Sequence, residues 1–275
     1  MFMRLIASLL FLLTLVPLAQ ATDQIRIAGS TSVLPIVAEA AKHYRQLHPG
    51  LSLTVSGGGS GVGVASVGQG MVEIGMVSRD LTAREKKRLD GKVRQVAVAR
   101  DAVAVAVSKA VYVGGVKQLS LGQIAAIYRG EIKNWKQLGG PDARILVIDK
   151  ESSRGTRHVF AKAVLGSEKA RAPGATIIAG SNNEEQAALA NSDQAIGMLS
   201  TAWLNDAVRA VAVGEGDNAV LPTMEHIADG SYPIQRDLNL LLSGEGGGQS
   251  DAFVEFLLSD EGQQIVQQVG YLPVR

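Results

Sequence analysis

The stretch QIRIAGSTSVLPIVAEAAKHYRQL, residues 24–47, decides the fold class. It opens with a short apolar strand, Gln24 to Ala28, which runs into the small, hydroxyl-rich loop Gly29 to Ser32. Apolar residues then recur at helical spacing as far as Leu47, where His48-Pro49-Gly50 ends the helix. A strand that leads through a short loop into an amphipathic helix is the repeating unit of α/β proteins.

The same alternation of strands and helices continues along the chain and predicts an α/β fold. The clearest further strands are Leu51 to Val55, Val72 to Val77, Val93 to Val107 (expected to form two strands), Ile145 to Ile148 and Leu238 to Leu242. The clearest further helices are Leu121 to Tyr128, one that starts after Gly155, and Asp251 to Val269. Before the first of these, Ser120 and Gln123 have the spacing of a capping box, and Gly130 lies just past its end.

The composition excludes several classes of protein. The chain has 275 residues, 46% of them apolar and 19% charged, with no cysteine and a formal net charge of +1. Without cysteine there is no disulfide scaffold, thiolate metal site or cysteine nucleophile. A charge near zero argues against non-specific binding to nucleic acid, which needs a strongly basic surface. We therefore expect a globular protein with no nucleic-acid partner.

The N-terminal segment 1–21 has the pattern of a signal peptide. Arg4 supplies the basic region, Leu5 to Val16 the apolar stretch, and Ala19-Gln20-Ala21 the cleavage site. The apolar stretch is much shorter than the ~20 residues of a spanning helix. We expect cleavage before Thr22 and a mature protein in the periplasm.

Three strand-to-helix loops are rich in small and hydroxyl residues. They are Gly29 to Ser32, Ser56 to Gly61 and Glu151 to Thr156. Unbonded N–H groups and the positive dipole end at a helix start attract anions, and glycine lets the backbone approach a ligand. One such loop is an ordinary capped turn, but three in one chain predict an anion site built from N–H and O–H donors.

Known catalytic and cofactor motifs are missing from the sequence. The glycine run Gly57 to Gly63 fits neither the Rossmann fingerprint nor the P-loop, and no serine has the nucleophile-elbow pattern. The four histidines show no metal-ligand spacing. We therefore expect no cofactor, no metal and no catalytic residues, although a hydrolase built on two carboxylates remains open.

Asp80 has two interpretations. It follows the strand Val72 to Val77 in the segment Ser78-Arg79-Asp80, where it could cap the next helix. Alternatively, it is a buried carboxylate that accepts the proton of bound phosphate. Sulfate has no proton to donate, so such a carboxylate would reject it.

Six segments carry a resemblance to a known family. They are GSTSVLP (29–35), SGGGSGVG (56–63), IGMVSRDL (74–81), LSLGQIAAIYRGEIKNWKQLGG (119–140), ESSRGTRHVF (151–160) and SYPIQRDLNLLL (231–242). In this order they make the chain similar to PstS-type phosphate-binding proteins of the periplasmic binding protein superfamily, over essentially the whole mature chain.

The resemblance implies a type II fold, with two α/β lobes joined by two crossover segments and a ligand cleft between them. Lobe one would comprise residues 22–106 and 206–275, and lobe two residues 107–205. The first crossover would be Val103 to Val107, and the chain would return between Gly197 and Val213.

The resemblance also implies a set of phosphate-binding residues. From lobe one these are Ser30, Thr31, Ser32, Ser60, Ser78 and Asp80, and from lobe two Ser153, Arg154, Gly155 and Thr156. The chain departs from the family at Lys150, where arginine is usual, and at Arg154, where a small residue is usual. Arg154 is either a replacement cation or a solvated arginine at the helix start. Arg79 also separates Asp80 from the serine that it usually follows.

The implied function is the capture of inorganic phosphate and its delivery to a membrane ABC permease, by a monomer that is not an enzyme. Three alternatives remain at this point. One is a receptor for another tetrahedral oxyanion, such as sulfate or molybdate. The second is a secreted hydrolase of phosphate esters, and the third is a secreted sensor for which phosphate is only a signal.

Overall fold

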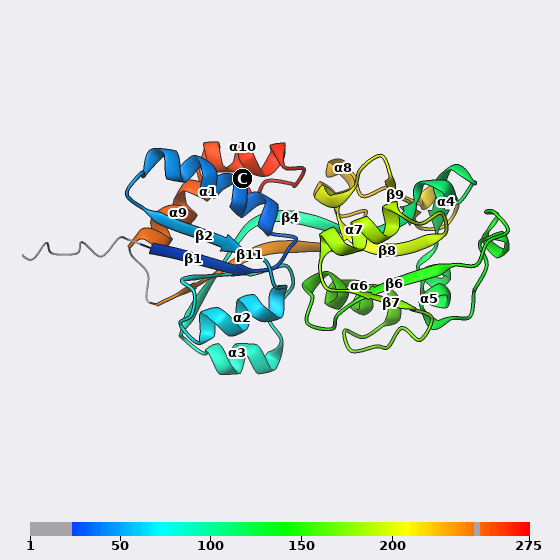
Figure 1. Ribbon diagram of the computed structural model, residues 1–275, viewed down its shortest axis with the longest axis horizontal. Coiled ribbons are helices and arrows are strands. Elements are labelled where there is room, and N and C mark those ends of the chain that lie inside the picture. The colour runs from blue at the N-terminus through cyan, green and yellow to red at the C-terminus, as the bar shows by residue number, and fades with distance from the viewer. Residues whose placement is uncertain (1–23, 245–247) are drawn as a thin grey trace, which may run out of the picture.

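The chain folds into two α/β lobes that share one continuous sheet (Figure 1). The structure is a computed structural model that describes residues 24–244 and 248–275. The predicted signal peptide lies outside the described residues. Two long strands, β4 (Val93–Ser108) and β11 (Gln235–Ser243), run through the waist between the lobes.

Lobe one is built around the first strand-loop-helix unit. Strand β1 pairs in parallel with β2 and β3, and β3 then pairs antiparallel with β11. Its elements are β1 (Gln24–Gly29), α1 (Leu34–Leu47), β2 (Ser52–Ser56), α2 (Ser60–Gly68), β3 (Ile74–Val77), α3 (Ala83–Leu89), α9 (Gln249–Leu258) and α10 (Asp260–Gln268). Buried residues of α1, α9 and α10 form one apolar core with β1, β3 and β11, and α2 and α3 pack on the opposite side.

Lobe two repeats this plan around β6 and β8. Strand β8 pairs antiparallel with β4 and parallel with β6, which pairs in parallel with β7. Its elements are α4 (Lys109–Val113), β5 (Gln118–Leu119), α5 (Leu121–Arg129), β6 (Leu146–Lys150), α6 (Gly155–Leu165), β7 (Ile177–Ala179), α7 (Asn182–Ala190), β8 (Ala195–Ser200), β9 (Val208–Ala210), β10 (Ala212–Val213) and α8 (Met224–Ala228), with short 3-10 turns at Trp135–Leu138, Thr201–Trp203 and Gly216–Asn218. The α/β expectation and the capping box of α5 are confirmed.

The expectation of two strands within Val93 to Val107 is wrong, because β4 is a single strand. Its first part pairs with β11 as far as Ala102, and from Val103 onward it pairs with β8. A change of partner therefore allows one strand to serve both lobes without a break. The change of pairing partner falls between Ala102 and Val103.

The chain returns to lobe one later than the expected boundary at 206. Val211, Val213 and Ile227 pack in the core of lobe two, as do Tyr232 and Ile234. The crossover strands meet where the Val103 N–H donates to the Ile234 carbonyl at 2.8 Å. The return therefore follows Ile234, because residues 206–234 are needed to complete the second core.

The C-terminal segment forms two helices where one was expected. Helix α9 ends at Leu258, and Ser259 takes an extended conformation before α10. The Ser259 hydroxyl accepts a hydrogen bond from the Gly262 N–H at 3.3 Å, which caps the second helix. The break turns α10 so that Ile265 and Val266 also reach the core of lobe one.

Candidate functional site

The loops singled out in the sequence meet at the junction of the two lobes. In each lobe parallel strands end at this junction, so the loops that follow their carboxyl ends come together. Five hydroxyl side chains gather there, each at most 3% exposed: Ser30, Ser32, Ser60, Ser78 and Thr156. We call these five residues the hydroxyl cluster.

Hydrogen bonds connect the cluster within lobe one and across the lobes. Ser30 Oγ donates to Ser78 Oγ at 2.8 Å, and the Ser78 N–H donates to Ser60 Oγ at 3.1 Å. Ser32 Oγ lies 3.1 Å from Thr156 Oγ1 of lobe two. A hydroxyl both donates and accepts, so this arrangement can reorient toward a bound anion.

A buried guanidinium from the second crossover strand completes the cluster. Arg236 Nη2 donates to Ser32 Oγ at 2.9 Å and Nη1 donates to Thr156 Oγ1, also at 2.9 Å. The same side chain forms an ion pair with Asp101 on β4, with Nη2 2.7 Å from Oδ2. Arg236 thus links lobe one, lobe two and the crossover strands through one planar group.

Asp101 is completely buried and fully hydrogen bonded. Its Oδ1 accepts hydrogen bonds from the backbone and the hydroxyl of Thr201, at 3.2 and 2.8 Å. Its Oδ2 accepts from Ser200 Oγ at 2.7 Å and from Arg236. The carboxylate therefore holds the guanidinium in place, since breaking a buried pair of this kind leaves an uncompensated charge.

The two lobes are closed against each other around the cluster. The Gly61 N–H of α2 donates to the Ser153 carbonyl at 3.1 Å. Asn182 of lobe two donates from Nδ2 to Ser32 Oγ at 3.0 Å. The Trp203 indole N–H reaches the Thr31 carbonyl at 3.2 Å, which places a tryptophan beside the first loop.

Of the ten expected site residues, five form the cluster, and Thr31 and Gly155 directly adjoin it. The other three donate no hydrogen bond to it. Asp80 is exposed, so the expectation that it is a buried acceptor is wrong. Its position follows from Arg79, which takes the buried place after Ser78. Arg154 pairs with Glu151 at 2.6 Å and packs against Gly59 of lobe one, with its side chain 16% exposed. Exposed Ser153 contributes only its carbonyl.

Lys150 is buried but is directed away from the cluster. It is 3% exposed, forms an ion pair with Glu185 of α7, and donates from Nζ to the Ser181 carbonyl at 3.2 Å. Burial lowers the pKa of Lys150 and raises that of Glu185, and their mutual attraction opposes both shifts. The pair fixes the start of α7 against β6.

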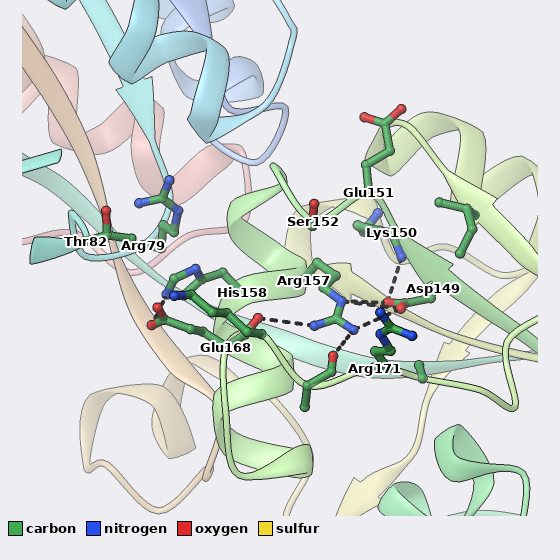
Figure 2. A pocket seen from close by; sticks show the side chains of 14 residues that line it. Arg79, Thr82, Asp149, Lys150, Glu151, Ser152, Arg157, His158, Glu168 and Arg171 are labelled. Carbon is green, nitrogen blue, oxygen red and sulfur yellow. Dashed lines mark hydrogen bonds and ion pairs between the residues drawn. The ribbon is translucent and has the colours of Figure 1, made fainter. Parts of the chain in front are cut away.

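A cavity of about 560 Å³ lies between the lobes beside the cluster and has a charged lining (Figure 2). Arg157 forms an ion pair with Asp149 at 3.2 Å and donates to the carbonyls of Glu168 and Ala170, so all three of its nitrogens are engaged.

His158 lies 2.9 Å from Glu168. Burial and then Arg79 lower the pKa of His158, and Glu168 opposes them. These contacts hold the first turn of α6, which carries Thr156, in place beside the cavity.

Arg79 fixes the end of β3 through a bidentate ion pair with Glu85, at 2.7 and 2.8 Å. Burial raises the pKa of Glu85, but the hydrogen bonds from Arg79 and Thr82 outweigh it and bring the pKa from 4.5 to about 2. A carboxyl with a lowered pKa stabilises the fold above its unfolded pKa, and this contribution is lost as the pH falls.

We expect Glu85→Gln to remove a pH-dependent part of the stability. The unmodified protein should lose on the order of 2 kcal/mol of unfolding free energy through this group as the pH falls, after allowance for partial exposure. The window runs from about pH 4.5 to about pH 2. Urea unfolding across this window measures the effect. Glu255→Gln, at an exposed position of α9, should leave the profile unchanged, and a Glu85→Gln profile parallel to that of the unmodified protein would contradict the assignment.

Sequence reasoning missed Arg236, Asp101 and Asn182. Arg236 lies in a segment that carried the family resemblance, but it received no role there. Asp101 had a visible signal, because it is a charged residue in the middle of the apolar run 93–107. No group of three or more histidine, aspartate or glutamate side chains within the described ranges could hold a metal ion.

Comparison with known proteins identifies the family. The sequence matches the PBP superfamily domain over residues 17–261. It is 34% identical over 260 residues to the phosphate-binding protein PstS of Bacillus subtilis, covering 93% of this chain and 82% of that protein. It is 28% identical to the PstS of Borreliella burgdorferi, covering 91% and 90% of the two chains.

Solved structures agree with the sequence comparison. A phosphate ABC transporter substrate-binding protein from Clostridium perfringens, solved with bound phosphate, is 33% identical and superimposes with a TM-score of 0.84 over 92% of this chain and 100% of that one. An ABC-type phosphate transport receptor from Vibrio cholerae is 31% identical, with a TM-score of 0.71 over 90% and 99%. The chain therefore belongs to the PBP superfamily and, within it, to the PstS family.

Proposed function

We propose that the chain is an exported receptor that binds inorganic phosphate between its lobes and delivers it to an ABC-type importer. The named relatives are phosphate-binding proteins and transport receptors, which are not enzymes. The observation that carries the proposal is the hydroxyl cluster with Arg236, because it gathers donors from both lobes around one point.

The donors suit a tetrahedral oxyanion. Ser30, Ser32, Ser60, Ser78 and Thr156 would supply hydroxyl groups, and Thr31 lies beside them with its Oγ1 3.3 Å from Asn182 Nδ2. The N-terminus of α6 at Gly155 adds backbone N–H groups. Asp101 balances the charge of Arg236, so the anion would be held by many dipoles rather than by excess positive charge.

Binding would be coupled to closure of the lobes. An anion at the cluster contacts residues of lobe one, Thr156 of lobe two and Arg236 of the crossover together only when the lobes are closed. A ligand shifts a conformational equilibrium by the contacts that it makes in one state alone. The closed, loaded form would then be the one that the importer recognises.

The place of action would be outside the cytoplasmic membrane, in the periplasm, with the protein acting as a monomer. The family of transport receptors and the predicted signal peptide support this location. Within residues 24–244 and 248–275, the helices are all too short or too polar to cross a membrane.

Calorimetric titration of the mature protein tests the proposal. The protein is first unfolded and refolded to remove any bound anion, and then titrated with phosphate in the presence and absence of excess sulfate. We expect one phosphate per chain. The absence of heat with phosphate would contradict the proposal, and binding of sulfate alone would reassign the ligand.

A further inference from the structure

One buried polar atom beside the hydroxyl cluster has no hydrogen-bond partner. Asn182 is the first residue of α7 and is 1% exposed. Its Nδ2 donates to Ser32 Oγ at 3.0 Å and to Thr31 Oγ1 at 3.3 Å. Its Oδ1, on the same planar amide, is buried and unpaired within the part of the chain that the structure describes. A buried amide oxygen without a partner is costly, which points to a ligand that donates to it.

The neighbouring hydroxyl groups do not supply this donor. Ser32 Oγ receives hydrogen bonds from Arg236 and from Asn182 itself, and a further hydrogen bond joins it to Thr156 Oγ1. Thr156 Oγ1 also receives a hydrogen bond from Arg236. Thr31 Oγ1 likewise accepts hydrogen bonds from Asn182. A protonated anion bound at the cluster is therefore a suitable donor to Asn182 Oδ1.

An acceptor-only atom distinguishes one oxyanion from another. At neutral pH phosphate retains a proton, whereas sulfate retains none. A serine or threonine hydroxyl serves both anions, since it can turn to donate or to accept. An amide oxygen only accepts, so it is satisfied beside hydrogen phosphate and remains unpaired beside sulfate.

The carboxylates near the cluster are not available for this role. Both oxygens of Asp101 are engaged by Thr201, Ser200 and Arg236. Glu185 is paired with Lys150, and Asp80 is exposed. Two buried side-chain oxygens of the described residues lack a hydrogen-bond partner, Asn182 Oδ1 and Glu185 Oε2. Because Glu185 Oε2 faces the Lys150 ammonium in an ion pair, Asn182 Oδ1 is the one that remains.

We propose that Asn182 Oδ1 accepts the proton of bound hydrogen phosphate and is the atom by which this receptor distinguishes phosphate from sulfate. The inference rests on the proposed function and assigns the specificity of that site. A neutral amide carries no full negative charge to repel sulfate. It therefore contributes a moderate preference, about 10- to 100-fold, the cost of one unsatisfied buried acceptor.

Dissociation constants for phosphate, arsenate and sulfate test the proposal, measured at a mildly alkaline pH where all three are dianions. We expect Asn182→Ala to lower the preference for phosphate over sulfate by about tenfold or more. The preference for phosphate over arsenate should not change, because arsenate keeps the same proton. A merely structural role would not separate these two ratios. Asn191→Ala, which changes an exposed asparagine at the other end of the same helix, is the matched control.

Asn182→Asp gives a second test with nearly the same side-chain shape. Its carboxylate accepts the phosphate proton and repels sulfate, so the preference for phosphate should rise. The proposal is overturned if Asn182→Ala keeps the original preference over sulfate, or if Asn182→Asp lowers it. It is also overturned if the unmodified protein binds both anions equally. A protein that binds no phosphate contradicts the proposed function itself.

Discussion

Arg236→Lys is expected to weaken phosphate binding by about 30-fold or more, although the side chain keeps its positive charge. Arg236 donates to Ser32, to Thr156 and to Asp101 from separate nitrogens of one plane. A lysine ammonium is a single point and cannot span these positions. Because a positive charge remains next to Asp101, the protein should still fold. Calorimetric titration with phosphate, together with thermal unfolding, measures both effects.

Arg154→Gln is the matched control for this prediction. Arg154 is the cation that the sequence pointed to, but it pairs with Glu151 and packs against Gly59 of the opposite lobe, outside the hydroxyl cluster. Removing its charge should change the affinity for phosphate by less than about threefold, because its guanidinium is paired with half-exposed Glu151 and donates no hydrogen bond to the hydroxyl cluster. A large loss of phosphate affinity in Arg154→Gln, with little loss in Arg236→Lys, would contradict this assignment. It would indicate that the cation at the anion site comes from the loop 151–156.

The contrast between Arg154 and Arg236 shows which site residues could be predicted from the sequence and which could not. Ser60 and Thr156 were found because each lies in a strand-loop-helix junction, whose role is local and readable within a few residues. Arg236 acts through Asp101, which is 135 positions away in the chain. Their meeting depends on the pairing of β4 with β11, and no local pattern encodes that register.

Asn182 shows a second limit on what the sequence can predict about the site. It follows β7, a three-residue strand that was not predicted, so its loop was not recognised as one of those at the junction. For Asp80 a local pattern suggested a buried carboxylate, whereas Arg79 takes the buried position and Asp80 is exposed. Sequence periodicity thus predicted the α/β architecture well, whereas the charged part of the candidate site depends on long-range contacts.

Gly155→Ala is expected to weaken phosphate binding by about 10- to 100-fold through a steric effect at the lobe boundary. A Cβ on Gly155 would lie 2.3 Å from Ser60 Oγ and 2.4 Å from Ser78 Oγ, both in the opposite lobe. These distances are too short for any non-bonded contact. The clash is relieved when the lobes separate, and neither apolar core needs to move.

The variant should therefore stay folded and shift toward the open form. We expect a larger radius of gyration by small-angle scattering in the presence of phosphate, with the melting temperature of the phosphate-free protein little changed. Gly122→Ala is the control, because the nearest atom to its added Cβ is Ser120 Oγ at 3.7 Å. If Gly155→Ala bound phosphate as tightly as this control and closed to the same radius, then α6 would not need to approach Ser60 for binding. Closure around the hydroxyl cluster would then not be the source of affinity.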